Sequence, residues 1–143
     1  MANRADPRQL LRLRRLEKVR AIAKDAAARE AAEAESTLVQ LDILAARTGQ
    51  LIGSYAARTD VTDAGALRML TSFRASLAGV GEATRADASR ARTFADAKLA
   101  SLAAAERSRQ AVEDRAKSAA DAIDQAGTPV AQGARRSLGT GLE

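Results

Sequence analysis

Two pairs of acidic side chains are the residues of this sequence best suited to acid–base chemistry. They are Glu113 with Asp114, and Asp121 with Asp124. Paired carboxylates act as acid and base in glycoside hydrolysis, where a cleft shifts their pKa values. The chain has no His and no Cys, which excludes a histidine base, thiolate zinc ligands and disulfides. We therefore interpret both pairs as a solvated helix face, and we predict no enzyme activity, no cofactor and no metal site.

Gly79-Val80-Gly81 contains two glycines of a phosphate-binding loop. Such a loop needs a preceding strand and a following Gly-Lys-Ser/Thr, and the sequence has neither. We expect a helix bend or a short non-helical link here.

A basic run near the start is the most informative charge feature. The net charge is +5, the pI is about 10.4, and the run comprises Arg8, Arg12, Arg14, Arg15, Lys18, Arg20 and Lys24. Arg8, Arg12 and Arg15 share one helix face at steps of four and three. Two interpretations stay open: a solvated face paired with acids of a second helix, or a docking surface for an acidic partner. Nucleic acid is disfavoured, because no aromatic residue interleaves the arginines.

The elements that carry these residues are helical. Alanine accounts for 36 of the 143 residues, and aromatic residues for 2%. Alanine has the highest helix propensity but buries little surface, so the composition favours long, closely packed helices over a thick core.

The first helix is predicted at about 7–57. Asp6-Pro7-Arg8-Gln9 supplies a capping Asp, a Pro at the first helical position and a Gln at the capping-box position. A heptad seam follows, with a stutter at Ala23, Ala27 and Ala31. Its members are Leu13, Leu16, Arg20, Ala23, Ala27, Ala31, Ala34, Leu38, Leu41, Ala45, Thr48, Ile52 and Tyr55.

The second helix is predicted at about 63–126, after a polar break at 58–63. Gly127-Thr128-Pro129 is expected to end it and to leave 127–143 as a flexible tail. Its predicted stripe comprises Leu67, Leu70, Phe73, Leu77, Val80, Thr84, Ala88, Ala91, Ala95, Leu99, Leu102, Val112, Ala116, Ala119 and Ile123. Leu67 to Leu77 is the bulkiest part, and it either packs on the first helix or anchors a partner.

Two helices joined by a short break predict an all-α fold, an elongated antiparallel two-helix coiled-coil hairpin over 1–126 with a disordered C-terminal tail. Residues 1–29 hold nine Arg or Lys against three acids, and the facing end is acidic. Pairing between these ends is expected to set orientation, although each exposed pair contributes well under about 1 kcal/mol. No apolar run is long enough to span a membrane, and the N-terminus lacks the pattern of a secretory signal.

In layout the sequence resembles the FliJ family of flagellar type III export proteins. The resemblance covers roughly residues 8–125. It comprises the Arg-rich start at 10–19, a long Ala/Glu/Arg helix with Leu38, Leu41 and Leu44, a polar break, Arg68-Met69-Leu70 to Leu77, and the charged stretch 106–115.

The resemblance implies a cytoplasmic coiled coil at the flagellar base, which docks in the hexameric export ATPase and engages the membrane export gate. It implies that the paired chain ends, Arg8 to Arg20 with Glu106 to Ile123, insert into the ATPase ring. Export chaperones are further candidate partners. The candidate partner-binding residues are Arg8, Arg12, Leu13, Arg15, Leu16, Arg20, Leu70, Phe73 and Leu77.

Two alternatives remain. A phasin-like protein would lay amphipathic helices on a storage granule, although such a helix needs a wider apolar face than a heptad seam. A basic nucleoid-associated coiled coil would show a steep salt dependence of DNA affinity.

Overall fold

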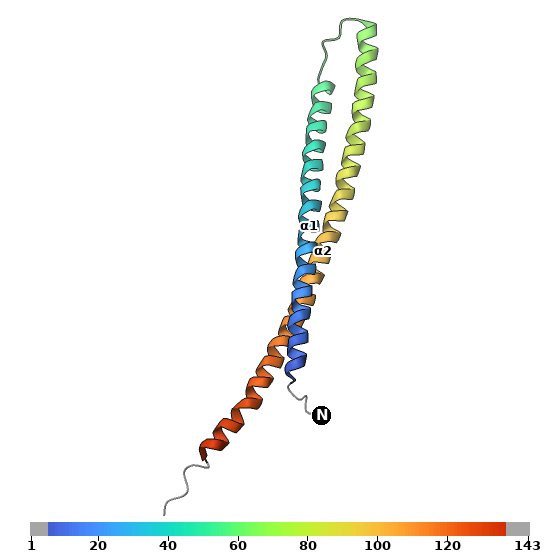
Figure 1. The fold of residues 1–143 in the computed structure, drawn as a ribbon. Helices are drawn as coiled ribbons and strands as arrows, with labels where there is room; N and C mark the ends of the chain where they lie inside the picture. Colours follow the sequence, from blue (N-terminus) through green and yellow to red (C-terminus); the bar gives the residue numbers. More distant parts are fainter. Residues whose placement is uncertain (1–5, 137–143) are drawn as a thin grey trace, which may run out of the picture. The chain divides into compact units, whose positions relative to one another are not determined.

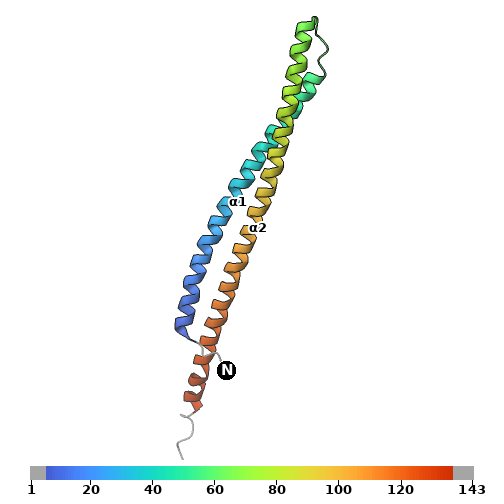
Figure 2. The ribbon, with the colours of Figure 1, turned by 90° about the vertical axis from the view of Figure 1, so that its right-hand side faces the viewer.

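The computed structural model describes residues 6–136, with the backbone alone over 128–136. It contains two helices, α1 (Pro7–Ala56) and α2 (Ala64–Arg136), joined by residues 57–63 (Figure 1). No strand occurs within 6–136. The helices form two compact units: unit 1 pairs the residues up to Ala26 with those from Ala103, and unit 2 comprises Ala27–Leu102. In unit 2 the helices lie side by side in both views (Figure 2). The predicted all-α two-helix hairpin is confirmed.

An aspartate caps the start of each helix. The Asp6 carboxylate accepts the backbone N–H of Arg8 at 2.9 Å, and Pro7 opens α1 as predicted. The Asp63 carboxylate accepts the backbone N–H of Ala66 at 2.7 Å. Both bonds satisfy a first-turn donor that has no partner inside its helix.

Arg74 of α2 caps the other end of α1. Its guanidinium donates to the Tyr55 carbonyl and to the Arg58 carbonyl, each at 2.9 Å. The Tyr55 and Phe73 rings are in tilted contact, with centroids 4.7 Å apart. The loop end is therefore held by one charged donor, which binds a carbonyl in the last turn of α1 and a carbonyl in the loop, and by one aromatic pair.

We expect Arg74→Met to lower the free energy of unfolding by about 1–3 kcal/mol, because the last carbonyls of α1 lose a charged donor while the aliphatic packing is largely kept. Urea denaturation followed by circular dichroism measures the loss. Arg68→Met is the control, since Arg68 is exposed and has no partner among the described contacts. Equal stability of the two variants would contradict the capping role.

The α1 seam is confirmed from Ala27 to Tyr55, because every predicted position there is buried or half-buried. It is wrong at Leu16, Arg20 and Ala23, which are exposed. The inward positions at this end are instead Leu10, Leu13, Glu17, Ala21 and Lys24. The consecutive steps of four therefore fall at 13, 17 and 21. Leu13 is predicted correctly, and the inward positions after it, 17, 21 and 24, lie one residue beyond the predicted 16, 20 and 23. Glu17 and Lys24 fit inward because their aliphatic stems pack while their charges stay in water.

The α2 seam follows an unbroken alternation of steps of four and three. Its buried or half-buried members are Leu70, Arg74, Leu77, Gly81, Thr84, Ala88, Ala91, Ala95, Lys98, Leu102, Ala105, Arg109, Val112, Ala116, Ala119 and Ile123. The predicted stripe is wrong at Phe73, Val80 and Leu99, which are exposed, and Leu67 is exposed as well. Strict heptad spacing keeps one seam against the partner helix. At each of the first three positions the true seam residue is small or charged, and the prediction chose its bulky apolar neighbour instead.

Small side chains fill the interface between the helices. The most buried residues are Ala31, Ala34, Thr48, Thr84, Ala88, Ala95, Val112 and Ala116. The Thr48 and Thr84 hydroxyls donate to the carbonyls of Leu44 and Val80 at 2.9 and 2.7 Å, so neither is unsatisfied. Such a seam lets the backbones approach closely, and it leaves many bulky apolar side chains outside.

Gly79 and Gly81 are both helical, which excludes the non-helical link, one of the two alternatives that the sequence left open. Gly81 lies in the seam, where an added Cβ would stand 2.7 Å from Cδ1 of Ile52. Gly79 faces open space. The second glycine therefore marks a close approach of α1 to α2.

The predicted stop at Gly127-Thr128-Pro129 is also wrong, since α2 continues to Arg136. A glycine C-cap needs a positive φ, and no described glycine has one. The rest of the predicted tail, 137–143, lies outside the described residues.

Neither α1 nor α2 has a stretch apolar enough to cross a bilayer within the part of the chain that the structure describes.

Candidate protein-binding surfaces

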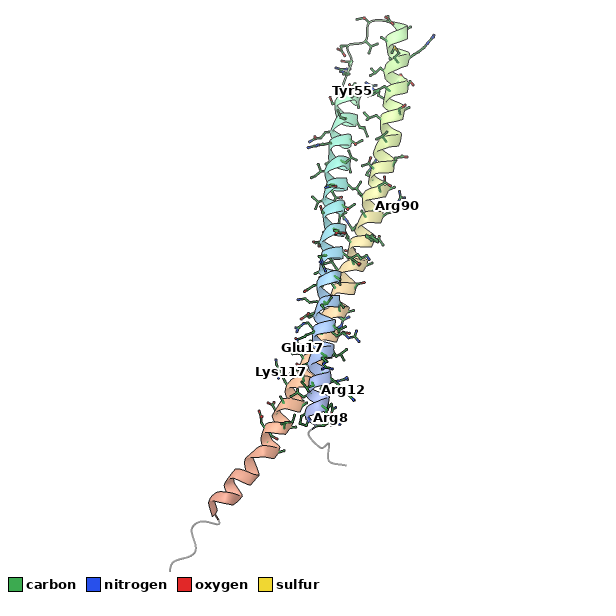
Figure 3. All side chains as sticks on the ribbon, in the orientation of Figure 1. Arg8, Arg12, Glu17, Tyr55, Arg90 and Lys117 are labelled. Carbon is green, nitrogen blue, oxygen red and sulfur yellow. The ribbon has the colours of Figure 1, made fainter. Side chains whose placement is uncertain are left out.

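The basic run of α1 points largely into solvent in unit 1. Arg8, Arg12, Arg15 and Arg20 are exposed, and Figure 3 labels the first two near the start of the helix. No ion pair among the described residues engages Arg12, Arg14, Arg15, Lys18 or Arg20. These cations are therefore available to a partner.

The acids of the facing helix are engaged mainly by their own helix. Arg109 binds Glu106 at 2.8 Å and Glu113 at 2.9 Å, and Lys117 binds Glu113 at 3.0 Å. Of the expected pairing between the two ends, the structure shows Lys24 with Glu106 at 3.9 Å. Glu17 of α1 acts electrostatically on Lys117, which is the opposite polarity to the predicted one (Figure 3).

This ladder of ion pairs shifts the pKa values of its members. A hydrogen bond from Arg109 lowers the pKa of Glu106, and hydrogen bonds from Lys117 and then Arg109 lower the pKa of Glu113. The bond to Glu113 raises the pKa of Lys117, and the bond to Glu106 raises the pKa of Arg109. The charged forms of all four groups are therefore favoured in the folded chain.

We expect unit 1 to lose stability as the pH falls below about 4.5, the ordinary pKa of the two glutamates. A folded-state pKa below the unfolded value means that the stabilisation exists above the unfolded pKa and disappears as the pH falls through the folded one. Thermal unfolding of the wild type and of a Glu106→Gln/Glu113→Gln variant, at pH 7 and pH 3, tests this. The variant should show the smaller change in Tm between the two pH values, and an identical change would contradict the ladder's role.

Glu113 and Asp114, the first carboxylate pair of the sequence, do not share a binding partner. Glu113 binds Arg109 and Lys117, whereas Asp114 accepts a hydrogen bond from Gln110 at 3.0 Å. No group of three or more acids that could hold a metal ion occurs among the described residues.

Three bulky apolar residues stand beside the free arginines, and the sequence analysis missed them. Leu11, Val19 and Ile22 are 58–67% exposed. With Arg12 and Arg15 they fall on one helix face, roughly opposite Leu10 and Leu13. Their spacing of eight and three residues places them on one helix face and could have identified them, but the sequence analysis followed a single apolar stripe. We name Leu11, Arg12, Arg15, Val19 and Ile22 the N-terminal surface.

A shallow groove of about 470 Å³ borders this surface. It is lined by Leu11, Arg14, Arg15 and Lys18, with Glu17 and Ala21. Leu16, a predicted partner-binding residue, is also exposed, while Leu13 is half-buried in the seam. The predicted partner-binding residues between Arg8 and Arg20 are thus divided between the seam and the exposed face of α1.

The second predicted cluster is divided in the same way. Leu70 and Leu77 are half-buried in the α2 seam, while Phe73 is exposed and contacts Tyr55. Arg58 lies over the Tyr55 ring, 5.0 Å from its centroid. Of the three residues, Phe73 alone is free enough to contact another molecule.

Comparison with protein-family models, with curated proteins and with solved structures gives no match.

Proposed function

We propose that this chain is a non-enzymatic binding protein that docks its N-terminal surface on an acidic surface of a partner protein. The observation that supports this most directly is the set of arginines left without an ion pair beside exposed Leu11, Val19 and Ile22. Arginine beside aliphatic side chains suits a helix-binding groove with an acidic rim. Burying each aliphatic side chain fully would contribute about 1.5–3 kcal/mol.

For the partner we propose the flagellar type III export apparatus, on the resemblance of the sequence to the FliJ family. In this proposal the paired ends of α1 and α2 enter the export ATPase ring, the chain also contacts the export gate, and it helps to couple ATP hydrolysis to export. Phe73 is the exposed candidate for the gate contact. The protein would then act in the cytoplasm, against the inner membrane at the flagellar base.

The experiment is a titration of the export ATPase of the same organism with this protein, with ATP hydrolysis as the readout. Stimulation should saturate near one copy per hexamer. Arg12→Glu/Arg15→Glu should raise the concentration needed for half-maximal stimulation at least about 10-fold, since a charge reversal turns attraction into repulsion.

Arg29→Glu/Arg68→Glu is the matched control, because it makes the same charge change on exposed arginines outside the two chain ends that the proposal places in the ring. Substitutions of Leu13 are unsuitable, since Leu13 belongs to the seam. No stimulation and no complex by analytical gel filtration would exclude the ATPase as partner. Equal effects of the two double variants would exclude the N-terminal surface.

A second candidate is a phasin-like role on a granule or anionic lipid surface. It is favoured by the same exposed aliphatic residues among arginines, which also characterise helices that lie on such surfaces. Binding to anionic vesicles or polymer granules that Val19→Asp/Ile22→Asp abolishes, with no response of the ATPase, would support this candidate over the first.

A further inference from the structure

Unit 2 has an apolar side that neither the seam nor the proposed function uses. Leu44, Leu51, Val80 and Phe94 are 50–56% exposed. Each directly precedes an inward-facing residue, namely Ala45, Ile52, Gly81 and Ala95. We name these four exposed residues the lateral face.

Both helices present these residues on the same side of unit 2. Each of these four inward-facing residues lies four positions after the preceding seam residue. A residue that directly precedes such a position flanks one edge of an antiparallel helix pair. Thr37, which precedes Leu38, and Phe94, which precedes Ala95, line one groove of about 540 Å³. Leu51 and Val80 are neighbours of Ile52 and Gly81, which meet across the seam.

The opposite edge of unit 2 is polar. Asp42 of α1 pairs there with Arg92 of α2 at 3.4 Å, and Glu35 and Arg85 hold the equivalent positions on neighbouring turns. Four exposed bulky apolar side chains thus gather on the lateral edge, whereas the opposite edge carries Leu99 among charged residues, and Val39 and Ile43 lie away from the lateral edge.

We propose that the lateral face is a homodimer interface, on which a second copy of this chain packs about a two-fold axis parallel to the helices. Two hairpins joined in this way form a four-helix bundle, whose centre buries the bulky side chains that the alanine seam leaves outside. The interface is isologous, so the lateral face must be complementary to itself.

The charges at its border meet this requirement. The groove is lined by Glu30 and Glu33 from α1 and by Arg90 and Lys98 from α2, so its two edges carry opposite signs. Lys98 binds Glu30 at 3.0 Å, which places these two positions at one level of the hairpin. The proposed axis brings the α1 edge of one copy onto the α2 edge of the other at the same level, and therefore Glu33 toward Lys98 of the second copy.

At a second level along the hairpin the charges are reversed, with a cation on α1 and an acid on α2. Arg47 lies midway along α1 between Asp42 and Ile52, whose partners across the seam are Arg92 and Gly81. Together with the Glu30–Lys98 pair, these contacts place the position facing Arg47 between Gly81 and Asp87 of α2, and Asp87 also pairs with Arg90 of its own chain. In the dimer Arg47 of each copy approaches Asp87 of the other. A two-fold axis perpendicular to the helices would instead bring α1 against α1, and would make none of these contacts.

Sedimentation equilibrium of the full chain tests the proposal. The wild type should dimerise at concentrations up to about 100 μM. Leu51→Glu/Val80→Glu should weaken association at least about 10-fold, because it places charges in the centre of the interface. Val39→Glu/Ile43→Glu is the control: these side chains are equally exposed but lie on the other side of α1, and this variant should dimerise like the wild type.

A charge exchange tests the axis. Arg47→Asp alone and Asp87→Arg alone should each weaken the dimer, and the combined variant should restore it, with circular dichroism showing unchanged helix content. A wild type that stays monomeric throughout this range overturns the proposal, as does equal weakening by the lateral and control variants. Failure of the combined variant to restore the dimer overturns the axis. Loss of export-gate or vesicle binding in Leu51→Glu/Val80→Glu, with the wild type monomeric, assigns the face to that other partner instead.

Discussion

Gly81→Leu is expected to destabilise unit 2 by about 1–3 kcal/mol relative to the same substitution two residues earlier, at Gly79. A Cβ at Gly81 would already stand 2.7 Å from Cδ1 of Ile52 and 3.6 Å from Cγ2 of Thr48, whereas a Cβ at Gly79 meets nothing within 4 Å. Both substitutions gain helix propensity, by about 1 kcal/mol. The difference between them therefore isolates the cost of forcing the helices apart.

Urea denaturation of the two variants and the wild type measures this difference. Gly79→Leu should be at least as stable as the wild type. Adding Ile52→Ala to Gly81→Leu should recover part of the loss, because it removes the side chain that the new leucine meets, and the coupling should appear in a double-mutant cycle. Equal stability of the Gly79 and Gly81 variants would falsify the close approach of α1 and α2 at this level.

Ala95→Asp should be the most damaging single charge placed in the seam of unit 2. Ala95 is 2% exposed, while Ala97, on the same helix, is exposed. Burying a polar or charged group without a partner costs about 1–3 kcal/mol in proteins, and more for a full charge. Since both positions change Ala to Asp within α2, the loss of helix propensity is common to the two variants.

We expect Ala95→Asp to lower the free energy of unfolding by about 2 kcal/mol or more beyond Ala97→Asp at pH 7. The gap should narrow at pH 3, where the new carboxyl is largely protonated. Thermal and urea unfolding at the two pH values provide the measurement. Equal free energies of unfolding for the two variants at pH 7 would mean that the helices separate easily enough for water to reach the seam.

The sequence alone predicted much of the fold because its signals are local. Asp6 and Pro7 predicted the start of α1, and the polar break predicted the loop before α2, because capping and turn formation depend on a few adjacent residues. Alanine content predicted helix because propensity is a property of the chain itself. The regular stretch from Ala27 to Tyr55 also predicted its inward face correctly. Gly127 and Pro129 show the limit of such signals, since they predicted a stop within what is a continuous helix.

The candidate surfaces depended on the tertiary structure, because the two faces of these helices are not separated by hydrophobicity. Gly81, Arg74 and Lys98 lie in the seam, while Val80, Phe73 and Leu99 lie outside it. Where backbones approach closely, a missing side chain or a flexible aliphatic stem fits better than a bulky apolar group. Periodicity established that α2 has a seam, and only packing against α1 decided its phase. The same packing left the arginines of α1 unpaired and the large aliphatic side chains exposed, because a seam of alanines has room for neither.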